Sequence, residues 1–247
     1  MIKSLKTFLE SAESALDISS WKSKPGSQLG SNAGGIHLDE TGQKHYVKFP
    51  RDPEQARQEA ASSKIHALLG VNTLGSKLVQ RGGKLGVATK WNDDLETKSP
   101  RDFENLTADQ AAHVARIHHA GVITKNWDTV GLEHDNIMFH KKTGVPHAVD
   151  QGGSLNYRAQ GGHKDFGNDI GEVKSYRDNN INPQAAHVFK HAFSAHPGVE
   201  KNELVHAKKL TYDDAHSAFA EVGVKNAKEL AKTVINRRDK LLQHYGV

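Results

Sequence analysis

Residues 126–139 read NWDTVGLEHDNIMF, and residues 146–150 read PHAVD after a turn at 142–144. The apolar residues on either side of the turn predict two short strands that run back on each other. Folding of this hairpin brings Asn136, just before the first strand, close to Asp150, just after the second. Amide and carboxylate oxygens are suitable ligands for a hard cation. The stretch therefore predicts a pair of metal ligands drawn from the two ends of one hairpin.

A second hairpin is predicted nearer the N-terminus. Its strands are expected at 36–38 and 45–49, joined by a turn at 39–42. Lys48 lies between two apolar residues on the returning strand. Strand alternation allows its ammonium to point inward, toward a phosphate, or outward into solvent.

The helix expected after this hairpin carries a candidate partner for the lysine. Asp52 followed by proline is typical of a helix start, because aspartate caps the N-terminus and proline fits the first helical position. The helix is expected to run to about Leu69. Glu59 lies in its middle and either pairs with Lys48 or is solvated, and Glu54 competes with it for that role.

Residues 31–35 read SNAGG and precede the first strand of this hairpin. Small residues let backbone N–H groups approach a phosphate, and a nest of amides favours anions. A flexible turn explains the same composition, so both interpretations stay open.

The remaining elements set the fold class. Strands cluster in the first ninety residues and helices dominate after residue 105, which predicts an α+β chain with a β-rich lobe over 1–95 and a helical lobe over 96–247. The other expected elements are an amphipathic helix over 1–16, strands near 77–80 and 85–90, a polar connector over 91–100, helices from Thr107 to Ala120 and from about Asn226 to Tyr245, and a glycine-rich loop over 151–167.

Composition excludes several classes of protein. The chain has 247 residues, of which 36% are hydrophobic, and no apolar run is long enough for a membrane helix. The absence of cysteine excludes disulfides, thiolate zinc sites, iron–sulfur clusters and cysteine nucleophiles. A net charge of +4 gives no indication of nucleic-acid binding. Without a secretory signal pattern, we expect a cytoplasmic protein or one exported without a Sec-type signal.

The order of these features resembles the protein-kinase-like fold over residues 29–154. In that superfamily a strand lysine binds nucleotide phosphates, a helix glutamate holds the lysine, a catalytic-loop aspartate serves the acceptor hydroxyl, and an asparagine and a later aspartate hold magnesium. The resemblance assigns these roles, in the same order, to Lys48, Glu59, Asp128, Asn136 and Asp150. ATP and Mg2+ are the implied cofactors.

The resemblance also places the nucleotide. It assigns Asn32, Gly34 and Gly35 to the phosphate-binding loop, and it puts Trp91 near the hinge between the lobes, where an adenine base would bind.

Departures from the family pattern point to an atypical branch, either the HipA-like and phosphoinositide-kinase-like enzymes or a minimal bacterial effector kinase. His-Arg-Asp and Ala-Pro-Glu are missing, and Asp128 precedes Asn136 by eight residues, more than the usual kinase spacing. Asp135 is therefore a rival for the acid/base role. The metal motif reads Asp-Gln-Gly from Asp150 onward. No long activation segment follows, so we expect no switch by phosphorylation of such a loop.

Residues 165–167 spell Asp-Phe-Gly, the usual magnesium motif of kinases. Asp165 nevertheless follows Asn136 by 29 residues, and no apolar strand leads to it. The metal ligand is therefore assigned to Asp150, and Asp165 is interpreted as a residue of the loop.

The 16 histidines are interpreted as surface residues or as buried residues with satisfied hydrogen bonds, and the basic C-terminal helix as having a solvated face. His187 and His191 have the i, i+4 spacing of a zinc site, yet no third ligand accompanies them in the sequence. The helix expected from about Asn226 carries lysines and arginines, among them Arg237, that are expected on a solvated face. Docking of that face to an acidic protein or anionic lipid is the alternative.

The sequence thus predicts an ATP- and magnesium-dependent phosphotransferase that acts on a protein hydroxyl, as a candidate secreted bacterial effector or toxin. A lipid or inositol headgroup, or another small molecule, is the second choice of acceptor. Transfer of AMP or another group from ATP, and a non-catalytic binding module, are the alternative functions.

Overall fold

The computed structural model describes residues 15–29 and 32–247. Its N-terminal part is a six-stranded sheet of order β1-β5-β6-β4-β3-β2, antiparallel except for the pairing of β1 with β5. The strands are β1 (Leu16–Asp17), β2 (Lys22–Ser23), β3 (Ala33–Leu38), β4 (Lys44–Phe49), β5 (Ser76–Arg81) and β6 (Lys84–Lys90). The two predicted hairpins of this region, 36–49 and 77–90, are both present.

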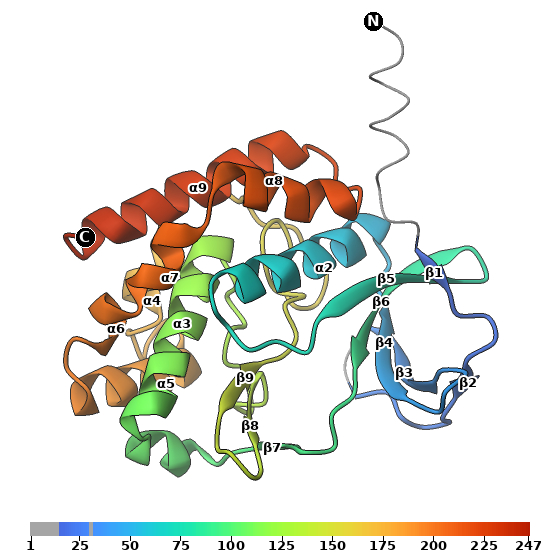
Figure 1. The fold of residues 1–247 in the computed structure, drawn as a ribbon, viewed down its shortest axis with the longest axis horizontal. Helices are drawn as coiled ribbons and strands as arrows, with labels where there is room; N and C mark the ends of the chain where they lie inside the picture. The colour runs from blue at the N-terminus through green and yellow to red at the C-terminus, as the bar shows by residue number, and fades with distance from the viewer. Residues whose placement is uncertain (1–14, 30–31) are drawn as a thin grey trace, which may run out of the picture.

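One helix, α2 (Pro53–Leu68), covers one face of this sheet and has α8 (Tyr212–Glu221) beside it (Figure 1). The carboxylate of Asp52 accepts a hydrogen bond from the Glu54 N–H, so aspartate caps the helix as expected. The chain leaves the helix through Gly70, whose φ of 75° suits glycine. The predicted helix is therefore confirmed at both ends.

The opposite face of the sheet is closed by the N-terminal segment. Ile18 and Trp21 pack there against side chains of β4, β5 and β6, among them Val47. The first predicted helix, over 1–16, lies almost entirely outside the described residues, and at its end Leu16 belongs to strand β1 instead.

A second, three-stranded sheet of order β7-β8-β9 joins the two parts of the chain. It is formed by β7 (Leu95–Thr97), β8 (Ile137–His140) and β9 (Pro146–Ala148). The hairpin of β8 and β9 is the one predicted from the sequence, with Ile137 opposite Ala148. The sequence predicted a polar connector over 91–100. Part of it forms strand β7 instead, because Leu95 pairs with His140. The division at residue 95 falls within this pairing and stays a prediction.

Helices make up most of the rest. Together they bury a continuous apolar core that extends from α2 to the last helix. The helical elements are η1 (Pro100–Asn105), α3 (Ala108–Thr124), α4 (Glu172–Ser175), α5 (Pro183–Ala195), α6 (Val199–Asn202), α7 (Leu204–Lys209), α8 and α9 (Ala227–His244). The predicted α+β class is confirmed, although α3 continues four residues beyond the expected end at Ala120. No helix in the described part of the chain is long and apolar enough to cross a membrane.

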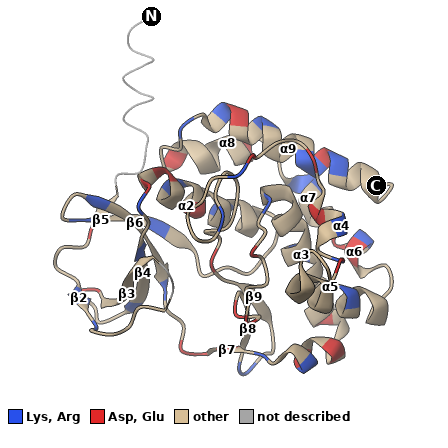
Figure 2. Cartoon of the chain, turned by 180° about the vertical axis from the view of Figure 1, so that it is seen from behind, with Lys and Arg blue, Asp and Glu red and all other residues tan. Residues whose placement is uncertain are grey.

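The basic C-terminal helix is α9, and one of its arginines is not on a solvated face. Arg237 is fully buried, and its guanidinium donates hydrogen bonds to the carbonyls of Val122, Ile123 and Gly167 and to the carboxylate of Glu172. The expectation was wrong because Arg237 lies one helical turn from both Val234 and Leu241, on the buried face of α9, where these acceptors satisfy its guanidinium. Figure 2 shows basic and acidic residues interspersed over α8 and α9.

Candidate active site

A buried ion-pair cluster links the sheet, α2 and the loop after β9. The ammonium of Lys48, on β4, forms a short ion pair with Glu59 of α2 and lies 2.8 Å from the Asp150 carboxylate. Lys48 and Glu59 are buried, at 7% and 4% exposure. Burial alone would lower the pKa of Lys48, but the facing carboxylates of Asp150 and Glu59 outweigh it and raise that pKa.

Alternation along β4 determines the direction of Lys48. Val47 packs into the cluster on the face closed by the N-terminal segment. The next side chain must point to the other face, which α2 covers. Lys48 therefore points inward, toward Glu59, and the outward orientation is excluded. Glu54 instead accepts a hydrogen bond from the backbone of Lys225.

The loop between α3 and β8 supplies the other two polar groups. The side-chain amide of Asn136 donates to the backbone carbonyl of Asp128 at 2.7 Å and to its carboxylate at 3.2 Å. Burial raises the pKa of Asp128 to about 6, helped by the negative charge of Asp150. The backbone N–H of Asp128 donates to the side chain of Asn126, which fixes the turn.

Two glycines let the loop after Asp150 pass between α2 and this turn. A Cβ on Gly152 would lie 3.0 Å from a carboxylate oxygen of Glu59, and one on Gly153 would lie 2.8 Å from the amide oxygen of Asn126. Asp150 itself has a φ of 57°, a left-handed conformation that is rare for residues with a side chain. The N–H of Gly152 donates a hydrogen bond to the Asp150 carboxylate at 3.0 Å. The turn thus holds the Asp150 carboxylate in place.

The donor set fits Mg2+. The Asp150 side chain is 47% exposed, so its carboxylate remains accessible. The amide nitrogen of Asn136 is bonded to Asp128, which leaves the amide oxygen as the ligand atom. The Lys48 ammonium pairs with the carboxylates of Glu59 and Asp150, and the third carboxylate nearby, that of Asp128, makes no ion pair with it among the described residues. A hard divalent cation would neutralise this excess of negative charge.

The residues assigned to the nucleotide are less closely gathered. Gly34 lies opposite Lys48 in the β3–β4 ladder, and a Cβ there would come within 1.9 Å of the Val47 carbonyl oxygen. Close strand packing is therefore sufficient to require glycine at this position. A Cβ on Gly35 would lie 2.7 Å from the hydroxyl of Ser27. Asn32 precedes β3, next to residues outside the described part.

Trp91 follows β6 at the far end of β4 from Lys48. Its backbone N–H donates to the Lys44 carbonyl at 2.9 Å, and its indole donates to Asp93 at 2.8 Å. The structure thus places Trp91 at the connection between the two parts of the chain, and it does not bring the indole into the Lys48 cluster.

The two rival aspartates have exposed side chains. Asp135 lies so close to Gly131 that a Cβ on the glycine would come within 2.2 Å of the Asp135 carboxylate. The negative charge of Asp135 contributes to the raised pKa of Asp128. Asp165 belongs to a loop in which Phe166 packs under the Arg237 guanidinium. No ion pair in the described residues joins Asp165 to Lys48, whereas Asp150 is joined to it directly.

Sequence reasoning missed the residues that hold the loop after Asp150. The buried ammonium of Lys164 makes short hydrogen bonds to the carbonyls of Gly153 and Tyr157. Gln58 of α2 accepts from the Asn156 N–H at 3.2 Å, and Gln55 approaches the Gly152 carbonyl at 3.5 Å. These polar residues follow no recognisable spacing, so only the fold reveals their contact with the loop.

The structure corrects two expectations about the histidines. His118 is fully buried among aromatic rings, and neither of its ring nitrogens has a hydrogen-bond partner among the described residues, so it is not a satisfied histidine. His187 and His191 do have an acidic neighbour, because Glu104 of η1 lies beside them. The sequence did not show this third group because η1 and α5 are far apart along the chain.

No family model and no curated protein matches the chain. Among solved structures it is similar to a Helicobacter pylori proinflammatory kinase, CtkA, with a TM-score of 0.59 and 14% identity over 93% of this chain and 94% of that one. A HipA toxin–antitoxin complex of Shewanella oneidensis matches with a TM-score of 0.44 and 11% identity, over 100% of this chain and 73% of that one. An aminoglycoside phosphotransferase of Alicyclobacillus acidocaldarius gives 0.38 and 11%, over 98% and 96%. The likeness to CtkA shows that this chain has the protein-kinase-like fold.

Proposed function

We propose that this chain is an ATP- and magnesium-dependent phosphotransferase that acts on a protein hydroxyl. The observation that carries the proposal is the meeting of Lys48 with Glu59 and Asp150, beside Asp128 and Asn136. Phosphoryl transfer requires mainly positioning and neutralisation of charge, which these groups supply in one place.

Each residue has a defined task in the proposed reaction. Glu59 orients the Lys48 ammonium toward the nucleotide phosphates, and Asn136 and Asp150 supply the oxygen ligands for magnesium. Bound magnesium would neutralise charge on the phosphates. Asp128 accepts the proton of the acceptor hydroxyl while the hydroxyl oxygen bonds to the γ-phosphorus and ADP leaves. A pKa of about 6 leaves Asp128 mostly ionised at neutral pH, as a base requires.

A cavity next to Asp128 supports a protein acceptor. It has a volume of about 200 Å3 and is formed by the Asp128 turn and by residues 181–184. Trp127, Leu132 and Ile181 line it and are 41%, 72% and 63% exposed. Large exposed apolar side chains around a candidate base are suited to contact an apolar side chain of a bound polypeptide segment.

The first test is a thermal-shift titration with ATP and Mg2+. The wild type should be stabilised, because a ligand that binds only the folded state raises its stability. Asp150→Ala should abolish the shift, while the matched control Asp165→Ala should retain it. A wild type without a shift would contradict nucleotide binding, and loss of the shift only in Asp165→Ala would contradict the assignment of the metal ligands.

The second test distinguishes the transferred group and the acceptor. Incubation of candidate acceptors with ATP labelled at the γ-phosphate should label protein, whereas ATP labelled at the α-phosphate should not. Label from the α-phosphate would indicate AMP transfer, and label in a lipid or inositol fraction would indicate a headgroup acceptor. ATP binding without transfer to any acceptor would favour a non-catalytic module. The effector or toxin role, and the location expected from the sequence, stay predictions.

A further inference from the structure

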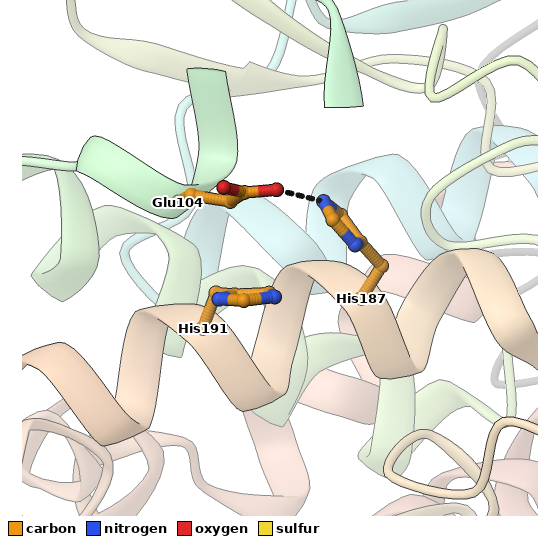
Figure 3. A group of neighbouring side chains, drawn as sticks. All are labelled: Glu104, His187 and His191. Atoms are coloured by element: carbon orange, nitrogen blue, oxygen red, sulfur yellow. Dashed lines mark ion pairs between the residues drawn. The ribbon is translucent and has the colours of Figure 1, made fainter. Parts of the chain in front are cut away.

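A cluster of three ligand-type side chains lies outside the proposed active site. Glu104 of η1, His187 and His191 each offer one ligand atom, and these atoms lie within 4.8 Å of one another. Figure 3 shows the two rings rising from the same face of α5, with the Glu104 carboxylate above them. From this arrangement we propose a second metal site in the chain, which binds a transition metal of the Zn2+ class.

The two histidines come from one helix at the spacing that places them one turn apart. Residues i and i+4 share a face of a helix, so both imidazoles point to the same side. Their ring centroids are 4.8 Å apart. Helix α5 and η1 pack directly against each other, and this brings Glu104 to the same place. Two secondary structures therefore supply the three groups, and an ion would connect them.

The His187 ring is already oriented by a backbone carbonyl. Its Nε2 lies 2.8 Å from the Pro100 carbonyl oxygen and 3.8 Å from a carboxylate oxygen of Glu104, and both oxygens can only accept a hydrogen bond. The ring proton must then be on Nε2, which leaves the Nδ1 lone pair for a metal. A ligating histidine commonly donates its other N–H to a carbonyl or carboxylate, which fixes its tautomer and orientation. Pro100 and Glu104 belong to the same short helix, so η1 contacts the ring in two ways.

An adjacent buried histidine is an independent sign of unused ligand chemistry. His134 is 9% exposed, and its Nε2 has no hydrogen-bond partner among the described residues. Its ring stands edge-on to that of His187, with centroids 5.8 Å apart. His134 also has a φ of 60°, an uncommon conformation for a residue other than glycine. It lies two residues before Asn136, so the proposed metal would lie next to the catalytic loop.

The chemistry of the donors separates this site from the magnesium site. Two imidazoles and one carboxylate favour Zn2+ and its neighbours among the transition metals, whereas Mg2+ prefers oxygen ligands alone. Glu104 and His191 are exposed and His187 is half-buried, so the site is open to solvent. Three protein ligands with an open fourth position are a common arrangement for zinc.

The test is a calorimetric titration of the full chain, free of any histidine tag and stripped with chelator, with Zn2+ in the presence of excess Mg2+. The wild type should bind one equivalent. His191→Gln should weaken binding at least tenfold, and Glu104→Gln should weaken it as well. The control His244→Gln, an exposed histidine at the end of α9, should bind as the wild type does.

Two further measurements make the outcome decisive. Co2+ in place of Zn2+ should produce the d–d absorption of a four-coordinate site in the wild type and His244→Gln, and not in His191→Gln. Circular dichroism of the variants would show that the exposed substitutions leave the fold intact. Equal Zn2+ affinity in wild type and His191→Gln, or no binding by the wild type, would overturn the proposal. Neither outcome depends on phosphotransferase activity, so this test stands apart from that of the proposed function.

Discussion

The Lys48 ammonium lies 2.8 Å from the Asp150 carboxylate, although 102 residues separate the two along the chain. Strand β4 presents the lysine on the face covered by α2, and the hairpin β8–β9 delivers the aspartate from the other part of the chain. Glu59 completes the contact from α2. One ion-pair cluster thus connects the N-terminal sheet, its helix and the hairpin.

Replacement of Lys48 should have a much larger effect on activity and stability than replacement of an ordinary lysine on the same strand. We expect Lys48→Met to lower phosphoryl transfer by about 10²-fold or more, because a positioned charge at the reacting phosphates is lost. It should also cost about 3–5 kcal/mol of stability, since Glu59 is left buried without its cation. Lys44→Met is the control, because the Lys44 ammonium pairs with Asp93 in an exposed position. Equal activity of the two variants would contradict the assignment.

The close approach of Gly153 to the turn that carries Asn126 and Asp128 predicts a second pair of variants. In Gly153→Ala the new Cβ would lie 2.8 Å from the Asn126 amide oxygen and 3.0 Å from the Cβ of Asp128. We expect kcat to fall by about 10²-fold, because small displacements of positioned groups are costly. Gly162→Ala has no neighbour closer than 3.6 Å and should keep wild-type activity. Steady-state kinetics of both variants, with melting temperatures measured in parallel, provide the check.

Buried histidines predict a loss of stability in mild acid. Burial lowers the pKa of His66 from 6.5 to about 4, that of His119 to about 3, and that of His118 well below its ordinary value. The unfolded chain therefore binds protons below pH 6.5 that the folded chain does not, and stability falls as the pH drops from 6.5 toward 4. Each such histidine contributes about 1.4 kcal/mol per pH unit within this window.

Urea unfolding between pH 7.5 and 5 measures this slope. His118→Phe should make the slope shallower, because a ring that cannot bind a proton replaces one among Phe189, Phe193 and Tyr176. The exposed His244→Gln should leave the slope unchanged. A slope that is the same in all three proteins would show that His118 does not titrate as its burial requires.

Arg237 should be a major structural residue of α9. We expect Arg237→Met to destabilise the fold by about 3–5 kcal/mol, because the buried Glu172 loses its paired cation and several carbonyls lose their donor. Lys240→Met, an exposed position on the same helix, should change stability by less than about 0.5 kcal/mol. Chemical denaturation of the two variants measures the difference. A small effect in both would contradict the structural role.

Local signals in the sequence were sufficient for much of the fold. The aspartate–proline start of α2 and the capping box of α3, formed by Thr107 and Gln110, act within one turn, so they can be recognised without the tertiary structure. The hairpins were predicted for the same reason, because alternation and turn residues are local. The extra turn of α3 and the short strand β7 were missed, since packing and pairing with distant residues form them.

The sequence by itself determined the α+β class, the hairpin of Asn136 and Asp150, and the set of candidate polar residues in their order. Only the tertiary structure decided that Lys48 points inward, that Arg237 meets Glu172, and that Glu104 lies beside His187 and His191. The physical reason is the range of the interactions. Capping, periodicity and turns act between near neighbours in the chain, whereas burial and ion pairing depend on which distant segments the folded core brings together.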